Sequence, residues 1–216
     1  GYEKLGAEKL RSYIDDFGFG VKTGIELPGE LAGAITFRNR IPTEVATAAF
    51  GQGRVLVTPL QQVAAVAAVA NGGKLMKPRL IHSISDPSTG EKQVFEPEVI
   101  RQVISESTSR QVGNYLESVV GDLKIGTGRN AYIPGYRIAG KTGTAEKVVN
   151  IDGKNVYSPD KFVVSFIGYA PVENPQIVLY VIVDEPQTEL AGGGSVAAPI
   201  FKKIMEQSLR RLDISP

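Results

Sequence analysis

Apolar residues recur three and four positions apart in three stretches of the chain, the spacing that places them on one face of a helix. These predicted helices cover residues 7–17, 106–120 and 196–212, and a fourth, over residues 59–70, is apolar nearly all round. Gly18 follows the first of them and is a typical helix-ending residue. The inner face of the last helix is expected to consist of Val196, Ile200, Ile204, Leu209 and Leu212.

The helix over residues 59–70 has the clearest boundary signals. Thr58 stands at the N-cap, Pro59 at the first helical position, and Gln61 completes a capping box. From Val63 onward the helix consists of Ala and Val, so it has no polar face to turn toward water. We therefore expect other parts of a core to surround it.

The second half of the chain contains β-branched runs with short connections, which are typical of strands. Three strands are expected, over residues 136–149, 162–169 and 176–183. A polar loop from Asn150 to Pro159 would join the first two, and a turn over residues 171–175 would join the last two. Connections this short favour an antiparallel meander. Residues 75–104 show only short β-like pieces separated by Pro and Gly.

These elements predict an α+β fold, an antiparallel sheet with packed helices. We expect a single domain with two parts, a helical lobe over residues 1–135 and the sheet strands with the closing helix over residues 136–216. Of the 216 residues, 42% are hydrophobic and 22% are charged, which is typical of a globular protein with a real core. The first residues resemble the middle of a helix cut from something longer, because no N-cap precedes them.

Charge and composition exclude several classes of function. The net charge is +1 and no basic run occurs, so nucleic-acid binding is not expected. The chain has no Cys, which excludes disulfides, thiolate metal sites and a Cys nucleophile. A Ser-His-Asp triad would need the single histidine, His82, which we interpret as a surface residue. No apolar run is long enough to cross a membrane.

The candidate chemistry lies in the strand-like run over residues 138–149. Lys141 stands beside two hydroxyl residues, Thr142 and Thr144, with Gly143 between them. A lysine supplies positive charge for a substrate carboxylate, hydroxyls can bind the same carboxylate, and a strand N–H can point at a developing oxyanion. A glycine within a strand often marks the close approach of a ligand or another backbone. The run therefore predicts a substrate-binding edge strand for an acyl donor.

Three other motifs have simpler explanations. A second Lys-Thr-Gly, at residues 22–24, lies in a turn rich in Gly and Pro, and we interpret it as a structural loop. Residues 126–131 fit a dinucleotide-binding pattern, but a predicted helix precedes them where that motif needs a strand. The three glycines at 192–194 could bind an anion at the start of the closing helix. A flexible turn is the favoured interpretation of these glycines.

Several short motifs, taken in series, resemble the C-terminal part of the transpeptidase domain of class B penicillin-binding proteins. They are Phe17-Gly18-Phe19-Gly20, Gly24-Ile25, Leu27-Pro28-Gly29-Glu30, Phe50-Gly51-Gln52-Gly53, Thr58-Pro59-Leu60-Gln61-Gln62, Ala70-Asn71-Gly72-Gly73, Gly126-Thr127-Gly128 and Gly140-Lys141-Thr142-Gly143-Thr144-Ala145. Each is common alone, but their order and spacing agree with the family over essentially the whole chain. The run over residues 61–66 most resembles the division and sporulation members of Gram-positive bacteria.

The resemblance implies a penicillin-binding protein/serine β-lactamase-like fold and a peptidoglycan D,D-transpeptidase. In this reaction a serine attacks the D-Ala-D-Ala carbonyl of a stem peptide, and β-lactam antibiotics mimic that acyl donor. Lys141 would assist the proton relay, and the hydroxyls of Thr142 and Thr144 would hold the substrate or drug carboxylate. The Thr144 N–H would form half of the oxyanion hole, and Gly143 would let the peptide lie along the strand. The family implies no metal or cofactor.

The family's nucleophile motif is not matched by a plausible segment. Ser-x-x-Lys occurs only at residues 158–161, in a predicted loop where no helical turn would hold the lysine against the serine, and Ser-x-Asn does not occur. We therefore expect the nucleophile to lie upstream and this chain alone to be inactive. The resemblance also implies action outside the cytoplasm by a protein anchored to the cell membrane through a segment absent from this sequence.

The missing motif also bears on partners and on alternative functions. We expect the N-terminal half of the same domain to bind this chain, because the helix over residues 59–70 needs to be covered. A non-catalytic peptidoglycan-binding or scaffold module remains an alternative for the fragment. A D,D-carboxypeptidase or serine β-lactamase relative is the alternative within the superfamily.

Overall fold

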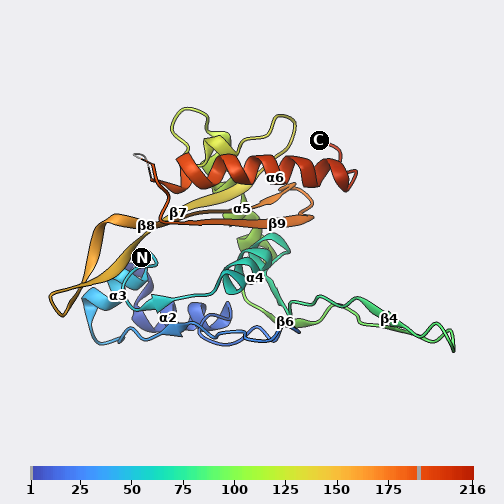
Figure 1. The fold of residues 1–216 in the computed structure, drawn as a ribbon, viewed down its shortest axis with the longest axis horizontal. Coiled ribbons are helices and arrows are strands. Elements are labelled where there is room, and N and C mark those ends of the chain that lie inside the picture. Colours follow the sequence, from blue (N-terminus) through green and yellow to red (C-terminus); the bar gives the residue numbers. More distant parts are fainter. Residues whose placement is uncertain (1, 189–190) are drawn as a thin grey trace. The chain divides into compact units, whose positions relative to one another are not determined.

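The computed structural model describes residues 2–188 and 191–216. The chain divides into two compact units (Figure 1). Unit 1 comprises residues 1–68 and 72–105, and unit 2 comprises residues 69–71 and 106–216. The units divide at residue 105, whereas we expected a helical lobe reaching residue 135. The difference arises because helix α5, Glu106–Gly121, packs against the sheet strand β7, Ala139–Ile151.

Unit 1 combines four helices with three pairs of short antiparallel strands among its described residues. The helices are α1 Tyr2–Leu5, α2 Ala7–Asp16, α3 Pro42–Ala48 and α4 Pro59–Ala70, whose last two residues belong to unit 2. The strands are β1 Ala34–Ile35, β2 Val55–Leu56, β3 Lys74–Met76, β4 Ser83–Ser85, β5 Lys92–Val94 and β6 Val99–Gln102. The pairs are β1 with β2, β3 with β6, and β4 with β5. The two helices predicted in this region are confirmed.

The predicted capping box at the start of α4 is confirmed and does more than cap the helix. The Gln61 backbone N–H donates to the Thr58 hydroxyl at 3.2 Å, and the Gln61 side-chain oxygen accepts from the Thr58 N–H at 2.9 Å. The amide nitrogen of Gln61 then donates to the carbonyls of Val21 and Ala32, at 2.7 and 2.8 Å. Gln61 is only 1% exposed. This buried amide therefore joins the loop before β1 to the start of α4.

Helix α4 is only partly covered within this chain, and the expectation that the rest of a core surrounds it stays a prediction. Gln61, Ala65 and Ala68 are buried, which defines a single inward face. Val63 and Val66, on other faces, are only partly buried. The helix therefore presents apolar surface that the described residues do not fully cover.

Unit 2 is a three-stranded antiparallel sheet with helices on both faces. Its remaining elements are the 3-10 turn η1 Arg129–Ala131, the strands β8 Lys154–Ala170 and β9 Ile177–Asp184, the π-helical turn η2 Gly193–Ala197 and the helix α6 Ala198–Arg211. The strand order is β7-β8-β9, which confirms the predicted meander. Helix α6 lies along the sheet (Figure 1).

The two helices cover opposite faces because side chains alternate along a strand. Phe166 of β8 packs its ring against Phe201 of α6, with centroids 4.7 Å apart in an edge-to-face arrangement. Tyr169, three residues further along β8, points to the other face. There it meets α5, where a Cβ on Gly113 would lie 2.7 Å from the Tyr169 hydroxyl oxygen.

The predicted polar loop over residues 150–159 is wrong. Strands β7 and β8 continue through most of that region as a long hairpin, paired from Val148 with Tyr157 to Ile151 with Lys154. The turn consists of Asp152 and Gly153, both with positive φ, at 51° and 77°. Asp-Gly is the residue pair that favours a two-residue hairpin turn. The pattern concealed the strands because this part of the hairpin has no buried face.

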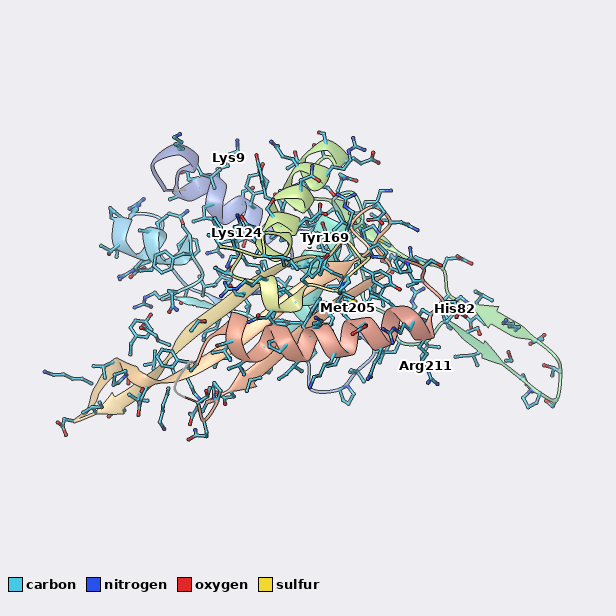
Figure 2. The ribbon with its side chains drawn as sticks, turned by 90° about the horizontal axis from the view of Figure 1, so that it is seen from above. Lys9, His82, Lys124, Tyr169, Met205 and Arg211 are labelled. Atoms are coloured by element: carbon cyan, nitrogen blue, oxygen red, sulfur yellow. The ribbon has the colours of Figure 1, made fainter. Side chains whose placement is uncertain are left out.

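The predicted inner face of the closing helix is largely wrong. Leu209 is buried as expected, but Ile200, Ile204 and Leu212 are 40%, 42% and 60% exposed. The buried face instead contains Ala198, Phe201, Met205 and Leu209. Met205 is labelled on this helix in Figure 2. These residues also have helical spacing, and the larger Phe and Met side chains fill the space opposite Phe166.

Replacing Phe201 by Ala should lower the free energy of unfolding by about 3–5 kcal/mol, because it removes a fully buried ring and leaves a cavity. The control Ile204→Ala removes a half-exposed side chain from the same helix and should cost about 1 kcal/mol or less. Urea denaturation of the folded protein measures both. Equal losses would contradict the observed orientation of α6.

Candidate functional site

The Lys-Thr-Gly run lies on strand β7, at an edge of the sheet formed by the described residues. Lys141 pairs with Ile167 of β8, and Thr144 pairs with Val164. Alternate residues of an edge strand leave their N–H and C=O groups free, so another extended peptide can pair with them. The edge position of β7 in the described sheet is as predicted, and substrate binding there stays a prediction.

Lys141 and Thr142 form a small polar cluster. The exposed Lys141 ammonium donates to the Thr142 carbonyl at 2.9 Å and to the Thr142 hydroxyl at 3.2 Å. The Thr142 hydroxyl lies 3.4 Å from the hydroxyl of Thr127. Among the described residues, no acidic side chain forms an ion pair with Lys141. The cluster therefore offers one positive charge and two hydroxyls to an incoming anion.

Thr127 is a neighbour of the site that the sequence-based argument did not assign. It belongs to the Gly126-Thr127-Gly128 segment, which follows α5. The sequence pattern of this segment indicates only a nucleotide-binding loop or a family motif. A Cβ on Gly128 would lie 2.9 Å from the Phe166 ring, so the glycine lets the segment pack closely on the sheet. The motif was the available signal, but its spatial partner Thr142 is fifteen positions away in sequence.

Two of the three glycines at 192–194, Gly193 and Gly194, serve close packing. A Cβ on Gly193 would lie 2.2 Å from the Ser165 carbonyl oxygen and 2.7 Å from that of Gly143. A Cβ on Gly194 would lie 2.3 Å from the Thr127 carbonyl oxygen. These distances exclude any side chain, so the glycine backbone lies directly against the Lys-Thr-Gly strand.

Hydrogen bonds connect the glycine segment to the site. The Gly193 N–H points to the Thr144 hydroxyl at 3.4 Å, and the Asn130 amide donates to the Gly194 carbonyl at 2.8 Å. The Thr144 side chain is exposed, so its hydroxyl remains accessible. The structure thus brings together Lys141, Thr142, Gly143 and Thr144, the four predicted site residues.

An ion-pair cluster lies where β7 leaves the sheet to form the hairpin. A register shift occurs between Glu146 and Val148, and the intervening Lys147 reaches Glu185 at 2.7 Å and Asp184 at 2.9 Å. Hydrogen bonds to Glu185 and then to Asp184 raise the pKa of Lys147. Because β8 lies between β7 and β9, this side chain links the two outer strands.

The second Lys-Thr-Gly copy is a structural loop, as predicted. The Glu30 carboxylate accepts from the Thr23 hydroxyl at 2.5 Å, from the Thr23 N–H at 2.7 Å and from the Gly24 N–H at 3.1 Å. The hydroxyl hydrogen bond is the main reason that the pKa of Glu30 is lowered. This copy does not lie on a strand.

Ser158, in the only Ser-x-x-Lys match of the sequence, has a structural role. It is 3% exposed, its hydroxyl donates to Asp160 at 2.7 Å, and the same oxygen accepts from the Lys161 N–H at 3.2 Å. The Lys161 ammonium instead lies 3.8 Å from Glu185. No Lys–Ser contact of the kind that activates a nucleophile is formed. His82 is exposed, as predicted.

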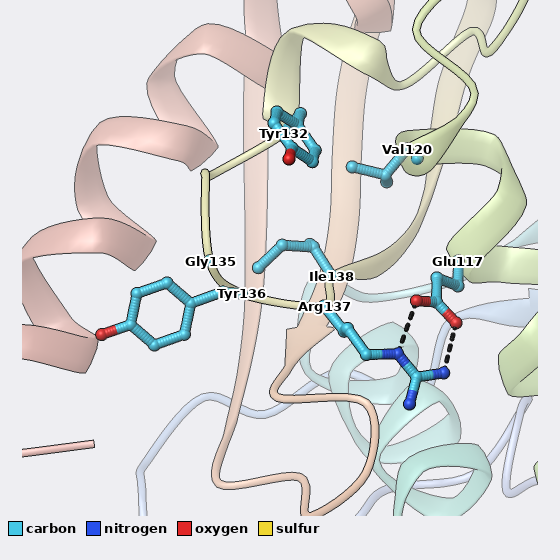
Figure 3. A pocket seen from close by; sticks show the side chains of 8 residues that line it. Glu117, Val120, Tyr132, Gly135, Tyr136, Arg137 and Ile138 are labelled. Carbon is cyan, nitrogen blue, oxygen red and sulfur yellow. Dashed lines mark hydrogen bonds and ion pairs between the residues drawn. The ribbon is translucent and has the colours of Figure 1, made fainter. Parts of the chain in front are cut away.

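A hollow of about 280 Å³ in unit 2 contains no residue of the Lys-Thr-Gly run (Figure 3). Arg137 dominates it by donating two hydrogen bonds of 2.7 Å to Glu117. This bidentate pair lowers the pKa of Glu117. We interpret the pair as a structural link between α5 and the segment before β7.

The described residues show neither a metal-binding cluster nor a membrane-spanning helix. No group of three or more His, Asp or Glu side chains there is arranged to hold a metal ion. No helix in the same ranges combines the length and apolar character needed to cross a membrane.

The fold is that of the penicillin-binding protein transpeptidase domain, and the chain belongs to this family. The family model, described as "Penicillin binding protein transpeptidase domain", matches residues 2–206. The resemblance seen in the sequence is therefore confirmed, together with the α+β fold.

Curated relatives agree with this assignment. The chain is 52% identical over 217 residues to stage V sporulation protein D of Bacillus subtilis, covering 99% of this chain and 32% of the relative. It is 38% identical over 214 residues to the probable peptidoglycan D,D-transpeptidase PenA of Neisseria gonorrhoeae, covering 99% and 34%. The first of these fits the predicted sporulation-type resemblance. The chain spans about a third of the length of these relatives.

A solved structure resembles the chain over nearly its whole length. Penicillin-binding protein 3 from Mycobacterium tuberculosis, complexed with ampicillin, gives a TM-score of 0.87 at 32% identity. The match covers 99% of this chain and 48% of that one.

Replacing Gly193 by Ala should destabilise unit 2 by about 1–3 kcal/mol, because the added Cβ would lie 2.2 Å from the backbone carbonyl oxygen of Ser165. Gly121→Ala is the control, since a Cβ at the end of α5 meets nothing within 4 Å. It should be neutral or slightly stabilising. Denaturant unfolding of both variants is the measurement, and a neutral Gly193→Ala variant would contradict the observed packing.

Proposed function

We propose that this chain is the substrate- and penicillin-binding part of a peptidoglycan D,D-transpeptidase. The complete protein cross-links stem peptides through a serine acyl-enzyme whose nucleophile lies outside these 216 residues. One observation carries the proposal: Lys141, Thr142 and Thr144 lie on an open-edged strand of a chain that belongs to the transpeptidase family.

The edge strand binds the acyl donor in two ways. The D-Ala-D-Ala end of the stem peptide pairs with the free backbone groups of β7 as an added strand. Its terminal carboxylate accepts hydrogen bonds from the hydroxyls of Thr142 and Thr144, beside the Lys141 ammonium. Gly143 presents no side chain, so the peptide backbone can lie close to the strand.

The chemical step uses Lys141 and the backbone of Thr144. The scissile carbonyl oxygen gains negative charge when the serine attacks, and the Thr144 N–H supplies half of the oxyanion hole. Lys141 assists proton transfer at the nucleophile. A β-lactam takes the place of the acyl donor, since its carboxylate and amide carbonyl offer the same groups. The ampicillin complex of the mycobacterial protein supports this ligand class.

In the complete protein, Lys141→Ala should slow acylation by a fluorescent penicillin by about 10²–10³-fold or more, because a pre-placed charge is lost from the transition state. Lys22→Ala is the matched control, since it removes the lysine of the structural copy, and it should leave the rate nearly unchanged. The second-order acylation rate constant is measured by stopped-flow or gel fluorescence. Equal effects of the two changes would show that the wrong copy was assigned to the site.

We further propose that the N-terminal half of the same domain binds this chain and supplies the nucleophile, its base and the second oxyanion donor. Two features support this, the incompletely covered apolar surface of α4 and the open edge of β7. The complete protein then acts outside the cytoplasm, held at the cell membrane by a segment absent from this sequence.

The chain alone should take up no penicillin and should self-associate or bind a hydrophobic dye, because its nucleophile and part of its core are missing. Co-expression with the preceding region should restore a stoichiometric covalent adduct. Intact-mass spectrometry detects the adduct, and size exclusion with light scattering reports the association state. A cooperatively melting monomer without dye binding would refute the proposal that half of the domain is missing. A covalent adduct on the chain alone would make Ser158 the candidate nucleophile.

The same experiment separates the transpeptidase from the alternative of a non-catalytic peptidoglycan-binding module. The buried, locally bonded hydroxyl of Ser158 is the observation that favours this alternative for the chain by itself. If the co-expressed pair also forms no adduct, the module is the better description. Release of D-alanine without cross-linking would instead indicate a D,D-carboxypeptidase.

A further inference from the structure

Glu146 lies on the same face of strand β7 as the two threonines of the site. Thr144 and Thr142 stand two and four residues before it, and side chains alternate between the two faces of a strand. The pairing of β7 with β8 is regular as far as Glu146, which lies opposite Phe162, and shifts only beyond it. The alternation therefore holds for all three residues. Glu146 thus extends the row of polar side chains that Thr142 and Thr144 begin.

The Glu146 carboxylate is available to a cation from outside the chain. Its side chain is exposed and forms no hydrogen bond or ion pair with residues 2–188 and 191–216. The lysine next to Glu146 and the lysine next to its cross-strand partner both lie against Glu185 instead. The Lys147 ammonium is 2.7 Å from the Glu185 carboxylate, and the Lys161 ammonium is 3.8 Å from it.

A hollow of about 690 Å³ adjoins this face of the sheet. It is lined by Phe162, opposite Glu146, and by the rings of Pro159 and Pro186. Asp160 is the single charged side chain among the described residues that line it. A long cationic side chain can pack its aliphatic stem on such rings while its charged end meets a carboxylate. The hollow therefore suits a positively charged side chain better than an acidic one.

The direction of the bound donor peptide follows from the proposed transpeptidase function, on which this inference rests. The terminal carboxylate of the peptide lies at the Lys141 end of the site, and its scissile carbonyl oxygen points to the Thr144 N–H. The preceding residue of the peptide therefore continues along β7 toward Glu146. Glu146 lies two positions beyond Thr144, which is about 7 Å along a strand. A side chain of lysine length on that preceding residue can span this distance.

We propose that Glu146 determines specificity for the acyl donor, by binding a protonated amine on the side chain of the residue that precedes D-Ala-D-Ala. The carboxylate accepts a charge-assisted hydrogen bond from the ammonium. Because Glu146 is exposed, the pair contributes modestly and is weakened by salt. Glu146 contacts the donor away from the scissile bond, so it is a specificity residue and not a catalytic one.

The test compares two synthetic donors with the complete protein, Nα-acetyl-lysyl-D-Ala-D-Ala and the same peptide acetylated on its side-chain amine. Release of D-alanine on acylation gives kcat/KM for each donor. The donor with the free amine should be preferred about two- to fivefold at low ionic strength, as expected for an exposed ion pair. The preference should fall as the NaCl concentration is raised. Acylation of the same protein by benzylpenicillin is measured in parallel.

Two changes at Glu146 separate its charge from its packing. Glu146→Gln should abolish the preference, and Glu146→Lys should favour the acetylated donor, because the ammonium of the other donor is then repelled. Asp152→Asn is the matched control, since it removes an exposed carboxylate six residues further along the same hairpin, and it should keep the wild-type preference.

The outcomes distinguish this inference from the proposed function. A wild-type protein that benzylpenicillin acylates but that shows no preference between the donors would overturn the role of Glu146 alone. An equal loss of kcat/KM for both donors in Glu146→Gln would also overturn it, because that result indicates a structural role. A wild-type protein that neither releases D-alanine nor reacts with benzylpenicillin would refute the proposed function and this inference with it.

Discussion

The close approach of the glycine segment to strand β7 is the contact on which the site depends. The backbone of Gly193 lies against both Gly143 and Ser165, at distances that no side chain would permit. This contact sets the position of Thr144, whose hydroxyl faces the Gly193 N–H. The glycine segment thus covers β7 where it pairs with β8. The opposite edge of β7 stays open within the described sheet. The Lys-Thr-Gly strand is therefore held in place by the fold itself.

Rigid elements hold the site on either side of the sheet. Phe166 anchors β8 to α6, while Tyr169 anchors it to α5. The Gly126-Thr127-Gly128 segment then packs on the Phe166 ring and presents a hydroxyl to the Lys-Thr-Gly strand. Site residues held in this way need little reorganisation when charge develops, which is the condition for electrostatic catalysis.

In unit 1, polar side chains that bond to backbone groups hold two of the loops in place. The Gln61 amide joins the start of α4 to the carbonyls of Val21 and Ala32, and the Glu30 carboxylate joins its own loop to Thr23. Both arrangements satisfy backbone groups that would otherwise lack partners in non-repetitive structure. They explain why the family's Gly- and Pro-rich motifs can be conformationally defined without regular secondary structure.

The sequence alone determined the helices with clear local signals, the meander and the four residues of the edge strand. A capping box and a Lys-Thr-Gly run can be recognised because their parts are neighbours in the chain. Only the tertiary structure decided which face of α6 is buried, how far the β7–β8 hairpin extends, and that Thr127 and Gly193 meet the site. Those features depend on residues far apart in sequence, such as Gly193 and Thr144, forty-nine positions apart, whose contact no local pattern encodes. Two faces of α6 have helical apolar spacing, and the volume opposite Phe166 selects between them.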